Sequence, residues 1–528
     1  MNKILVTAFV LWMCIGIFPL QCYETDGWEI ILGCDILYRE GWTLPPVYSY
    51  AYWMQPLMTI LIVGVKHLVP LLSCEQIYCL LSAAASLVFV HGCVVLARRI
   101  TGESTLRVLM ATALLPEMYA IAMYPNTAAP AAACFVWALL LISKRRYWLA
   151  GLLMCIAALF RIDVMLVFPV ILPLMWYEGK PLLKSLGVSA CFGVAVVAAT
   201  FGLYALLGAD LLHTLDEYGL KGNLGLTEFA LAIVGYYSLV YFVLLPVGLG
   251  VITAQRRWRL LGLILLPLVV IHGFTMGSAS KHFLYLSPFV ITAGVYALAW
   301  IEGRLRGRRV LKWAVGAGLL LFMTVSVRKQ NLSMPWVQQN PLHQAGMVLP
   351  LYTMERGNWA IALGIGAGYQ LVTADENMLA TGHLFYPWYI REIKEVMGGW
   401  REEQMEVARG LTTANLTTCE WGALAPIAIG LMEDGDCHFR QRENMPEAYM
   451  YTLSRRQGDL HFWRVISGAV TGQQQIGDSI ARLSALLPAG GRFIVAGLNH
   501  YGTDHLLDEM AQTGGMEKKA ACLYEIRR

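Results

Sequence analysis

Apolar runs of membrane-spanning length recur along residues 1–327 of this 528-residue chain and restrict what it can fold into. A helix needs about 20 mostly apolar residues to cross a bilayer. Only 14% of the residues are charged, whereas a soluble domain has about a quarter, and the deficit is confined to the same region. From residue 328 onward, charged and apolar residues mix as in soluble domains. We therefore predict a polytopic α-helical membrane protein, with a membrane domain over 1–327 and a soluble domain over 328–528.

The apolar runs predict about eleven transmembrane helices. They are expected at 4–20, 76–98, 104–122, 127–143, 147–161, 163–177, 184–207, 229–253, 259–277, 282–300 and 310–327. A further apolar stretch, 53–72, is interrupted by polar residues and two prolines. This pattern is typical of helices that lie in the membrane interface. We place the stretch in a first outer loop over 21–75.

Basic residues orient the predicted helices. With the N-terminus in the cytoplasm and 53–72 outside, most Lys and Arg residues of the membrane domain fall in cytoplasmic loops, as the positive-inside rule requires. If 53–72 crossed the membrane, the bias would invert. The soluble domain is therefore predicted to be extracytoplasmic. Because the chain shows no eukaryotic sorting signal, we expect a bacterial inner (plasma) membrane.

The C-terminal domain is predicted to be α/β. The segment Trp359–Thr373 is apolar and rich in glycine, Trp388–Trp400 has helical character, and Arg492–Gly497 has the pattern of a buried strand. The glycines of Gly364–Gly368 lack the spacing of a dinucleotide-binding fingerprint. The formal charge of +4 gives no indication of a nucleic-acid partner.

Two carboxylates, Glu24 and Asp26, directly follow the first apolar run. Ionised side chains at a membrane are costly and are commonly functional. The alternative for Asp26 is a helix-end residue solvated at the interface.

Other polar residues fall on the same predicted outer side. They are Asn126, Arg161, Asp163, Lys281 and His282. Arg161 and Asp163 lie between two spans, where a mutual salt bridge that fixes the turn is one reading. The other interpretation is that Arg161 binds a phosphate, because a guanidinium suits phosphate well. Lys281 and His282 lie at the predicted outer end of a span and are candidates for phosphate binding. The alternative is that they snorkel to lipid headgroups.

Glu117 and Tyr285 complete the set of candidates. Glu117 follows a proline inside an apolar run, and an intramembrane carboxylate is a functional candidate by default. Tyr285 lies one helical turn after Lys281 and would line the same wall. Its alternative is a tyrosine of the interfacial aromatic belt.

Four short motifs in this order resemble those of the GT-C glycosyltransferases, integral membrane enzymes that use polyprenyl-phosphate-linked sugars. They are the acidic pair Glu24-x-Asp26, the proline-containing stretch Tyr52–Leu57, the step Arg161–Asp163, and the late segment Lys281–Pro288. The match covers about 1–327. The chain departs from the family in having E-x-D as its acidic motif, and Ile162 where the family has proline.

The resemblance implies roles for these residues. Asp26 would be the catalytic base of an inverting transfer, with Glu24 beside it either binding the acceptor or sharing a divalent cation such as Mg²⁺ or Mn²⁺. Arg161, Lys281 and His282 would bind the donor phosphate. Glu117, Asn126, Asp163 and Tyr285 would be candidates for further substrate contacts. The sequence does not establish any cofactor.

The predicted partners are a polyprenyl-phosphate-linked sugar donor, membrane lipid, and an extracytoplasmic lipid, glycan or protein acceptor. Two alternatives stand beside the enzyme. A lipid or glycan transporter, or flippase, explains the helices and buried charges, but no two-fold internal repeat common in transporters is visible. A non-catalytic scaffold would require the acidic pair to be dispensable.

Overall fold

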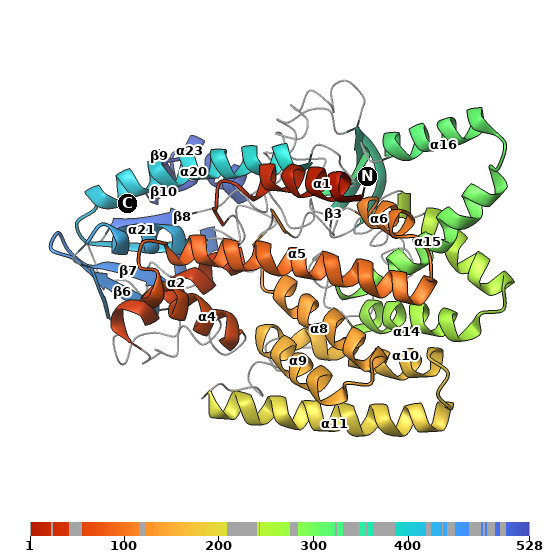
Figure 1. Ribbon diagram of the computed structural model, residues 1–528. Helices are drawn as coiled ribbons and strands as arrows, with labels where there is room; N and C mark the ends of the chain where they lie inside the picture. The colour runs from red at the N-terminus through yellow and green to blue at the C-terminus, as the bar shows by residue number, and fades with distance from the viewer. Residues whose placement is uncertain are drawn as a thin grey trace.

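The computed structural model combines a layered array of helices with a β-sheet domain at one end (Figure 1). It describes residues 2–22, 25–41, 55–115, 122–123, 125–207, 240–241, 243–274, 284–322, 325–330, 348–354, 357–363, 386–418, 424–435, 437–440, 449–463, 477–478, 481–482, 492–496 and 503–526. We call the end that meets the C-terminal domain the sheet end. It contains the N-terminal ends of helices α5 (Cys74–Thr101) and α8 (Ala128–Ser143) and the C-terminal end of α9 (Tyr147–Phe160).

Three further helices, α1 (Asn2–Ile17), α2 (Thr25–Glu40) and α4 (Pro56–Leu68), precede α5. Helix α4 has 13 residues, so it is about 20 Å long, short of the roughly 30 Å of a bilayer core. Helix α9, which falls in a predicted span, is nearly as short at 14 residues, so the interfacial position of 53–72 stays a prediction. Helix α5 begins at a capping box formed by Ser73 and Gln76.

The remaining helices follow the predicted spans, with two differences. They are α6 (Thr105–Ala113), the 3₁₀-helix η2 (Ile162–Val170), α10 (Ile171–Tyr177), α11 (Leu182–Leu206), a helix at Val243–Ala254, α14 (Trp258–Phe274), the 3₁₀-turn η4 (Leu284–Leu286), α15 (Ser287–Arg304) and α16 (Arg309–Phe322). Helix α6 ends well before residue 122, because Pro116 disfavours helical geometry in the residue before it. The predicted 163–177 helix begins as the 3₁₀-helix η2.

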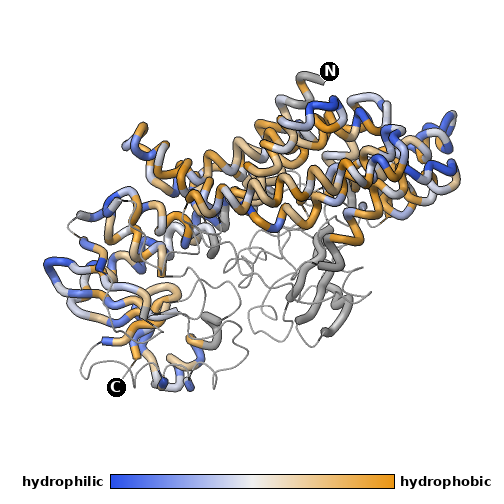
Figure 2. The backbone as a smooth tube through the Cα atoms, turned by 90° about the horizontal axis from the view of Figure 1, so that it is seen from below, coloured by the Kyte–Doolittle hydropathy of each residue, from blue (hydrophilic) through white to orange (hydrophobic). Residues whose placement is uncertain are grey.

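Three helices of the described residues are both long and apolar enough to cross a membrane. They are Cys74–Thr101, Leu182–Leu206 and the continuous unit Leu284–Arg304. Six described helices are apolar but shorter. In Figure 2 hydrophobic residues run along the middle of the helices and hydrophilic ones gather at the turns.

Opposite the sheet end, basic side chains hold helix ends together. Arg99 of α5 donates to the Ser143 carbonyl at 3.0 Å, and the Tyr177 hydroxyl donates to the Ile100 carbonyl at 2.7 Å. Carbonyls at helix C-termini lack intrahelical donors and attract cations. The loops that contain these residues thus meet at one end of the helices, and their predicted cytoplasmic position stays a prediction.

The C-terminal region contains two sheets. A three-stranded antiparallel sheet has the order β1-β3-β2, and a seven-stranded mixed sheet has the order β5-β6-β7-β4-β8-β10-β9. The strands are β1 (Val325–Gln330), β2 (Val348–Met354), β3 (Gly357–Leu363), β4 (Ala414–Thr418), β5 (His438–Arg440), β6 (Tyr449–Ser454), β7 (Leu460–Trp463), β8 (Arg492–Ala496), β9 (Met516–Ala520) and β10 (Leu523–Ile526). Strand β8 confirms the buried strand predicted at 492–497. Strand β1 begins inside the predicted last span, so the predicted boundary at 327/328 falls within a strand.

Three helices accompany the sheets, namely α20 (Tyr386–Gly410), α21 (Ala425–Glu433) and α23 (Thr503–Gln512). The central strand β4 pairs in parallel with both β7 and β8 and is buried along its whole length. The α/β character predicted for this region is therefore present in the fold. Helix α20 extends from the large sheet along α1 (Figure 1).

A glycine sets the distance between two of the apolar helices. A Cβ at Gly248 would lie 2.0 Å from the carbonyl oxygen of Ala293 in α15, whereas a Cβ at Gly250 would meet nothing within 4 Å. Small residues let membrane helices approach closely.

We predict that Gly248→Ala lowers the thermal unfolding temperature in detergent, because the added methyl collides with backbone that cannot rotate away. A cost of about 1–3 kcal/mol is typical of such overpacking. Gly250→Ala, in the same helix, is the matched control and should be neutral or slightly stabilising. Equal effects of the two substitutions would contradict this helix packing.

Candidate active site

The acidic pair lies where α2 begins. Glu24 is outside the described residues, and Asp26 occupies the first turn of α2. A Cβ at Gly27 would lie 2.5 Å from Cys22 Sγ and 3.1 Å from the Tyr78 ring. Only glycine permits this approach, so the first turn of α2 packs directly against the first turns of α5.

Tyr78 links this turn to Asn126. Its hydroxyl donates to the Pro125 carbonyl at 3.4 Å. One turn further along α5, the Ser82 hydroxyl accepts the Asn126 N–H at 2.9 Å. The structure thereby brings the acidic helix start and the Asn126 turn to adjacent positions along α5, as their shared predicted side implies.

Asn126 has a structural function in this arrangement. Its Oδ1 accepts the Ala129 N–H at 3.0 Å, which satisfies one of the unpaired donors in the first turn of α8. The residue is 1% exposed. Its predicted role in substrate contact stays a prediction.

Arg161, Asp163 and Tyr285 form one buried polar group. Arg161 Nε donates to Asp163 Oδ2 at 2.7 Å, and the Tyr285 hydroxyl donates to Asp163 Oδ1 at 2.9 Å. The side chains of Arg161 and Asp163 are 3% and 10% exposed, and Tyr285 is 1% exposed. The predicted salt bridge is therefore present, and Asp163 connects the start of η2 to η4.

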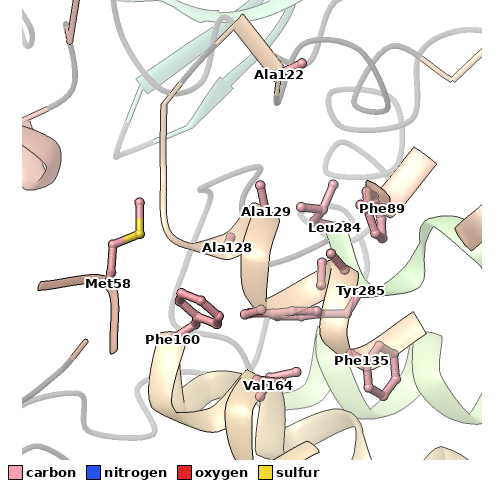
Figure 3. Close-up of a cluster of buried hydrophobic side chains, with 14 of the residues drawn as sticks. Met58, Phe89, Ala122, Ala128, Ala129, Phe135, Phe160, Val164, Leu284 and Tyr285 are labelled. Atoms are coloured by element: carbon pink, nitrogen blue, oxygen red, sulfur yellow. The ribbon is translucent and has the colours of Figure 1, made fainter. Parts of the chain in front are cut away.

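The surroundings of this group are apolar. Figure 3 shows Tyr285 with Phe160, Val164 and Phe135, and its ring meets Phe135 edge-on with centroids 6.1 Å apart. A tyrosine buried in this way is not an interfacial belt residue, so that alternative was wrong. Lys281 and His282, which directly precede η4, and Glu117 lie outside the described residues.

An apolar groove runs between α9 and α11. Its volume is about 640 Å³. The groove is lined by Tyr147, Trp148, Gly151, Leu152, Cys155, Phe192, Ala195, Val196, Ala199, Gly202, Leu203 and Leu206. Leu203 also packs against the buried cluster that contains Ile162, the residue between Arg161 and Asp163. One lining residue of the groove is therefore close to the turn that contains the buried ion pair.

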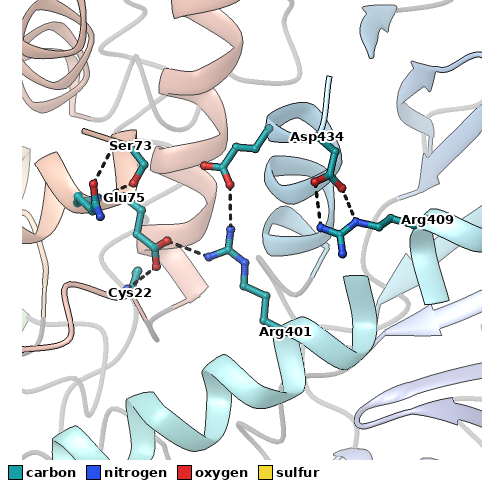
Figure 4. Close-up of polar contacts among 8 residues, drawn as sticks. Cys22, Ser73, Glu75, Arg401, Arg409 and Asp434 are labelled. Atoms are coloured by element: carbon teal, nitrogen blue, oxygen red, sulfur yellow. Dashed lines mark hydrogen bonds and ion pairs between the residues drawn. The ribbon is translucent and has the colours of Figure 1, made fainter. Parts of the chain in front are cut away.

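Sequence analysis missed a second buried ion pair at the sheet end. Glu75 Oε2 accepts from Arg401 Nη1 at 2.8 Å, and Glu75 Oε1 accepts the Cys22 N–H at 2.8 Å. Figure 4 shows both contacts. The sequence Ser73-x-x-Gln76 signals a helix start with Glu75 in its first turn. No sequence pattern indicated that its partner lies in the C-terminal domain.

Within the part of the chain that the structure describes, no group of three or more His, Cys, Asp or Glu side chains is arranged to hold an ion. The predicted pair Glu24 and Asp26 lies partly outside that part, so its binding of Mg²⁺ or Mn²⁺ stays a prediction.

Comparisons with known proteins identify the fold. No family model matches the sequence, and no curated protein matches it. The solved structures that match in fold include ArnT from Cupriavidus metallidurans in the apo state and the same protein bound to undecaprenyl phosphate. Each has a TM-score of 0.58 at 12% identity, and each alignment covers 99% of this chain and 96% of ArnT. This chain has the ArnT fold.

These structures support the GT-C-like fold that the four short motifs predicted. The resemblance predicted from four short motifs is therefore confirmed at the level of the fold. The alignment extends beyond the predicted membrane domain and includes the C-terminal sheets, which the motifs did not cover.

The Asp163 contacts generate a prediction about stability. Asp163→Asn removes the carboxylate charge that faces the buried Arg161 guanidinium, a loss that typically costs about 3–5 kcal/mol. Tyr285→Phe removes one hydrogen bond to a carboxylate that keeps its arginine, which costs about 1–3 kcal/mol. Thermal unfolding in detergent should therefore rank Asp163→Asn below Tyr285→Phe, and Tyr285→Phe below the wild type. The reverse order for the two variants would show that Asp163 is not held mainly by Arg161.

Proposed function

We propose that this chain is an integral membrane glycosyltransferase that moves a sugar from a polyprenyl phosphate to an extracytoplasmic acceptor. The observation that carries the proposal is the apolar groove between α9 and α11, whose lining residue Leu203 packs against the cluster that contains Ile162, the residue between Arg161 and Asp163. It occurs in a fold whose neighbour ArnT has been solved with undecaprenyl phosphate bound. An apolar groove suits an isoprenoid tail, and a guanidinium close to one of its lining residues suits a phosphate head.

In this proposal the tail lies along the groove and the phosphate lies near Arg161. Lys281 and His282 are proposed as further ligands of the same phosphate, because they precede in sequence η4, whose Tyr285 contacts Asp163. Cationic donors there stabilise the negative charge that develops on the departing phosphate. Asn126 and Glu117 are the further candidates for contact with the sugar or acceptor.

Asp26 is the proposed base. The acceptor hydroxyl oxygen attacks the anomeric carbon, the bond from that carbon to the phosphate oxygen breaks, and the polyprenyl phosphate leaves with its electron pair. Asp26 takes the hydroxyl proton, and attack opposite the leaving group inverts the configuration. Glu24 is proposed to bind the acceptor. One carboxylate is enough for this step, and the metal alternative is that Glu24 and Asp26 share a divalent cation.

The first test uses purified wild type and Asp26→Asn with a panel of polyprenyl-phosphate sugars in nanodiscs. Wild type should turn over one donor, and Asp26→Asn should lose at least about 100-fold in kcat while remaining folded, as expected for removal of a general base. Turnover should survive chelation. A chelator-sensitive reaction would instead assign Glu24 and Asp26 to a cation.

Other outcomes overturn the proposal. If Asp26→Asn matches wild type, Asp26 is not the base. If every donor is inert and the reconstituted protein instead moves a lipid across the bilayer, the transporter reading replaces the enzyme.

The groove yields a separate prediction. Ala199→Trp places a large side chain in the groove and should raise KM for a long-chain donor by about tenfold or more, because several tail methylenes lose their apolar contacts. A donor with a short prenyl chain should be unaffected. Val194, 70% exposed on α11 and absent from the groove lining, supplies the matched control Val194→Trp. Equal KM changes for both donors, or for both variants, would show that the tail binds elsewhere.

A further inference from the structure

Helix α20 of the C-terminal region runs alongside the segment that leads into the acidic pair. A Cβ at Gly16 would lie 3.0 Å from the Cα of Pro387, and a Cβ at Gly398 would lie 3.1 Å from Gln21 Oε1. Residues 16–21 thus lie alongside residues 387–398, and the two segments run in the same direction. The two segments are more than 360 residues apart in sequence, so this contact is tertiary.

The first fixed point is Lys394. Its Nζ donates to the carbonyls of Gly16 and Ile17 at 2.9 Å each and of Pro19 at 3.2 Å. Such carbonyls at a helix C-terminus have no intrahelical donor and favour a cation. Lys394 is 1% exposed. Burial lowers the pKa of its ammonium to about 8, which still leaves it mostly charged at neutral pH.

The second fixed point is Arg401, about two turns further along α20. It binds Glu75, which in turn accepts the Cys22 N–H. The Arg401 guanidinium also lies 5.0 Å from the centroid of the Trp28 ring, within cation–π range. Cys22 precedes the acidic pair and Trp28 follows it. Arg401 therefore contacts the following side directly, through the Trp28 ring, and the preceding side through Glu75.

Helix α20 is itself anchored to the large sheet. Gln404 Nε2 donates to the Ala521 carbonyl at 3.0 Å, and the Ala521 N–H donates to Glu403 at 3.1 Å. Arg455 donates to the carbonyls of Ala408 and Leu411 at the end of the helix. The position of the sheet is therefore transmitted to Lys394 and Arg401.

We propose that Lys394, Arg401 and Glu75 are positioning residues that set the orientation of the acidic segment for catalysis. The C-terminal domain would then help to position the catalytic residues, in addition to providing a surface for the acceptor. This inference rests on the proposed function, because it assumes that Asp26 is the base. Displacement of a catalytic group by about 1 Å can cost 100-fold in rate.

The test compares the double variant Glu75→Gln/Arg401→Gln with wild type. Removing both charges leaves neither Glu75 nor Arg401 opposite a missing charge, and the second carboxylate that faces Arg401, Glu433 at 3.9 Å, is half-exposed and can be solvated. We expect kcat to fall by at least about tenfold while the donor KM stays within about twofold, because the donor groove is untouched. Lys394→Met should behave in the same way. Hydrogen exchange of the peptide covering 16–28 should be faster in both.

Arg409→Gln is the matched control. Arg409 is on the same helix and forms a two-bond ion pair with Asp434 at 2.6 and 2.9 Å, away from the acidic segment (Figure 4). Its kcat and its exchange at 16–28 should match wild type. If the double variant fails to fold, Arg401→Lys, which keeps the charge but offers fewer donors in a different geometry, replaces it with the same expected direction.

The outcomes separate this inference from the proposed function. If the wild type turns over no donor, the proposed function is overturned. Hydrogen exchange of residues 16–28 then tests by itself whether Lys394, Arg401 and Glu75 hold this segment in place. The positioning role alone is overturned if wild-type activity depends on Asp26 but Glu75→Gln/Arg401→Gln and Lys394→Met match Arg409→Gln in kcat and in hydrogen exchange. A loss of kcat that merely follows the folded fraction also overturns it.

Discussion

The buried carboxylate of Glu75 joins three parts of the chain that are distant in sequence. It receives the Cys22 N–H ahead of α2 and the guanidinium of Arg401 from α20, and it sits itself at the start of α5. A carboxylate that is 8% exposed is tolerated only when it is paired and hydrogen-bonded. The fold therefore needs all three segments in place at once, which makes the C-terminal domain integral to the sheet end.

The same constraint operates at Asp163. One of its oxygens binds Arg161 and the other binds Tyr285, so α9, η2 and η4 meet at one carboxylate. Buried polar contacts of this kind have a narrow range of acceptable geometry. They hold these ends of the apolar helices at fixed positions, whereas packing alone would allow sliding. The proposed donor site and the proposed base thus rest on two separate polar contacts within one helical framework.

The sequence predicted those features whose cause is local. Apolar runs located the helices, a broken run located the short α4, and Arg161 with Asp163 could be paired because they are two residues apart. The 3₁₀ start of η2 and the early end of α6 depend on details of backbone geometry that hydrophobic patterns do not encode. The contacts of Tyr285 with Asp163 and of Arg401 with Glu75 span 122 and 326 residues. Such pairs are set by the tertiary fold, and nothing in one sequence identifies the partners.

The most direct test of the account is the location of a polyprenyl phosphate on the protein. A photoreactive undecaprenyl phosphate can be cross-linked in nanodiscs and the labelled peptides mapped by mass spectrometry. If the donor binds as proposed, labelling of α9, α11 and the Arg161–Asp163 turn is saturable. Ala199→Trp reduces this labelling, and unlabelled undecaprenyl phosphate competes with it. Labelling that is not saturable, or that maps to the opposite, basic end of the helices, would contradict the account.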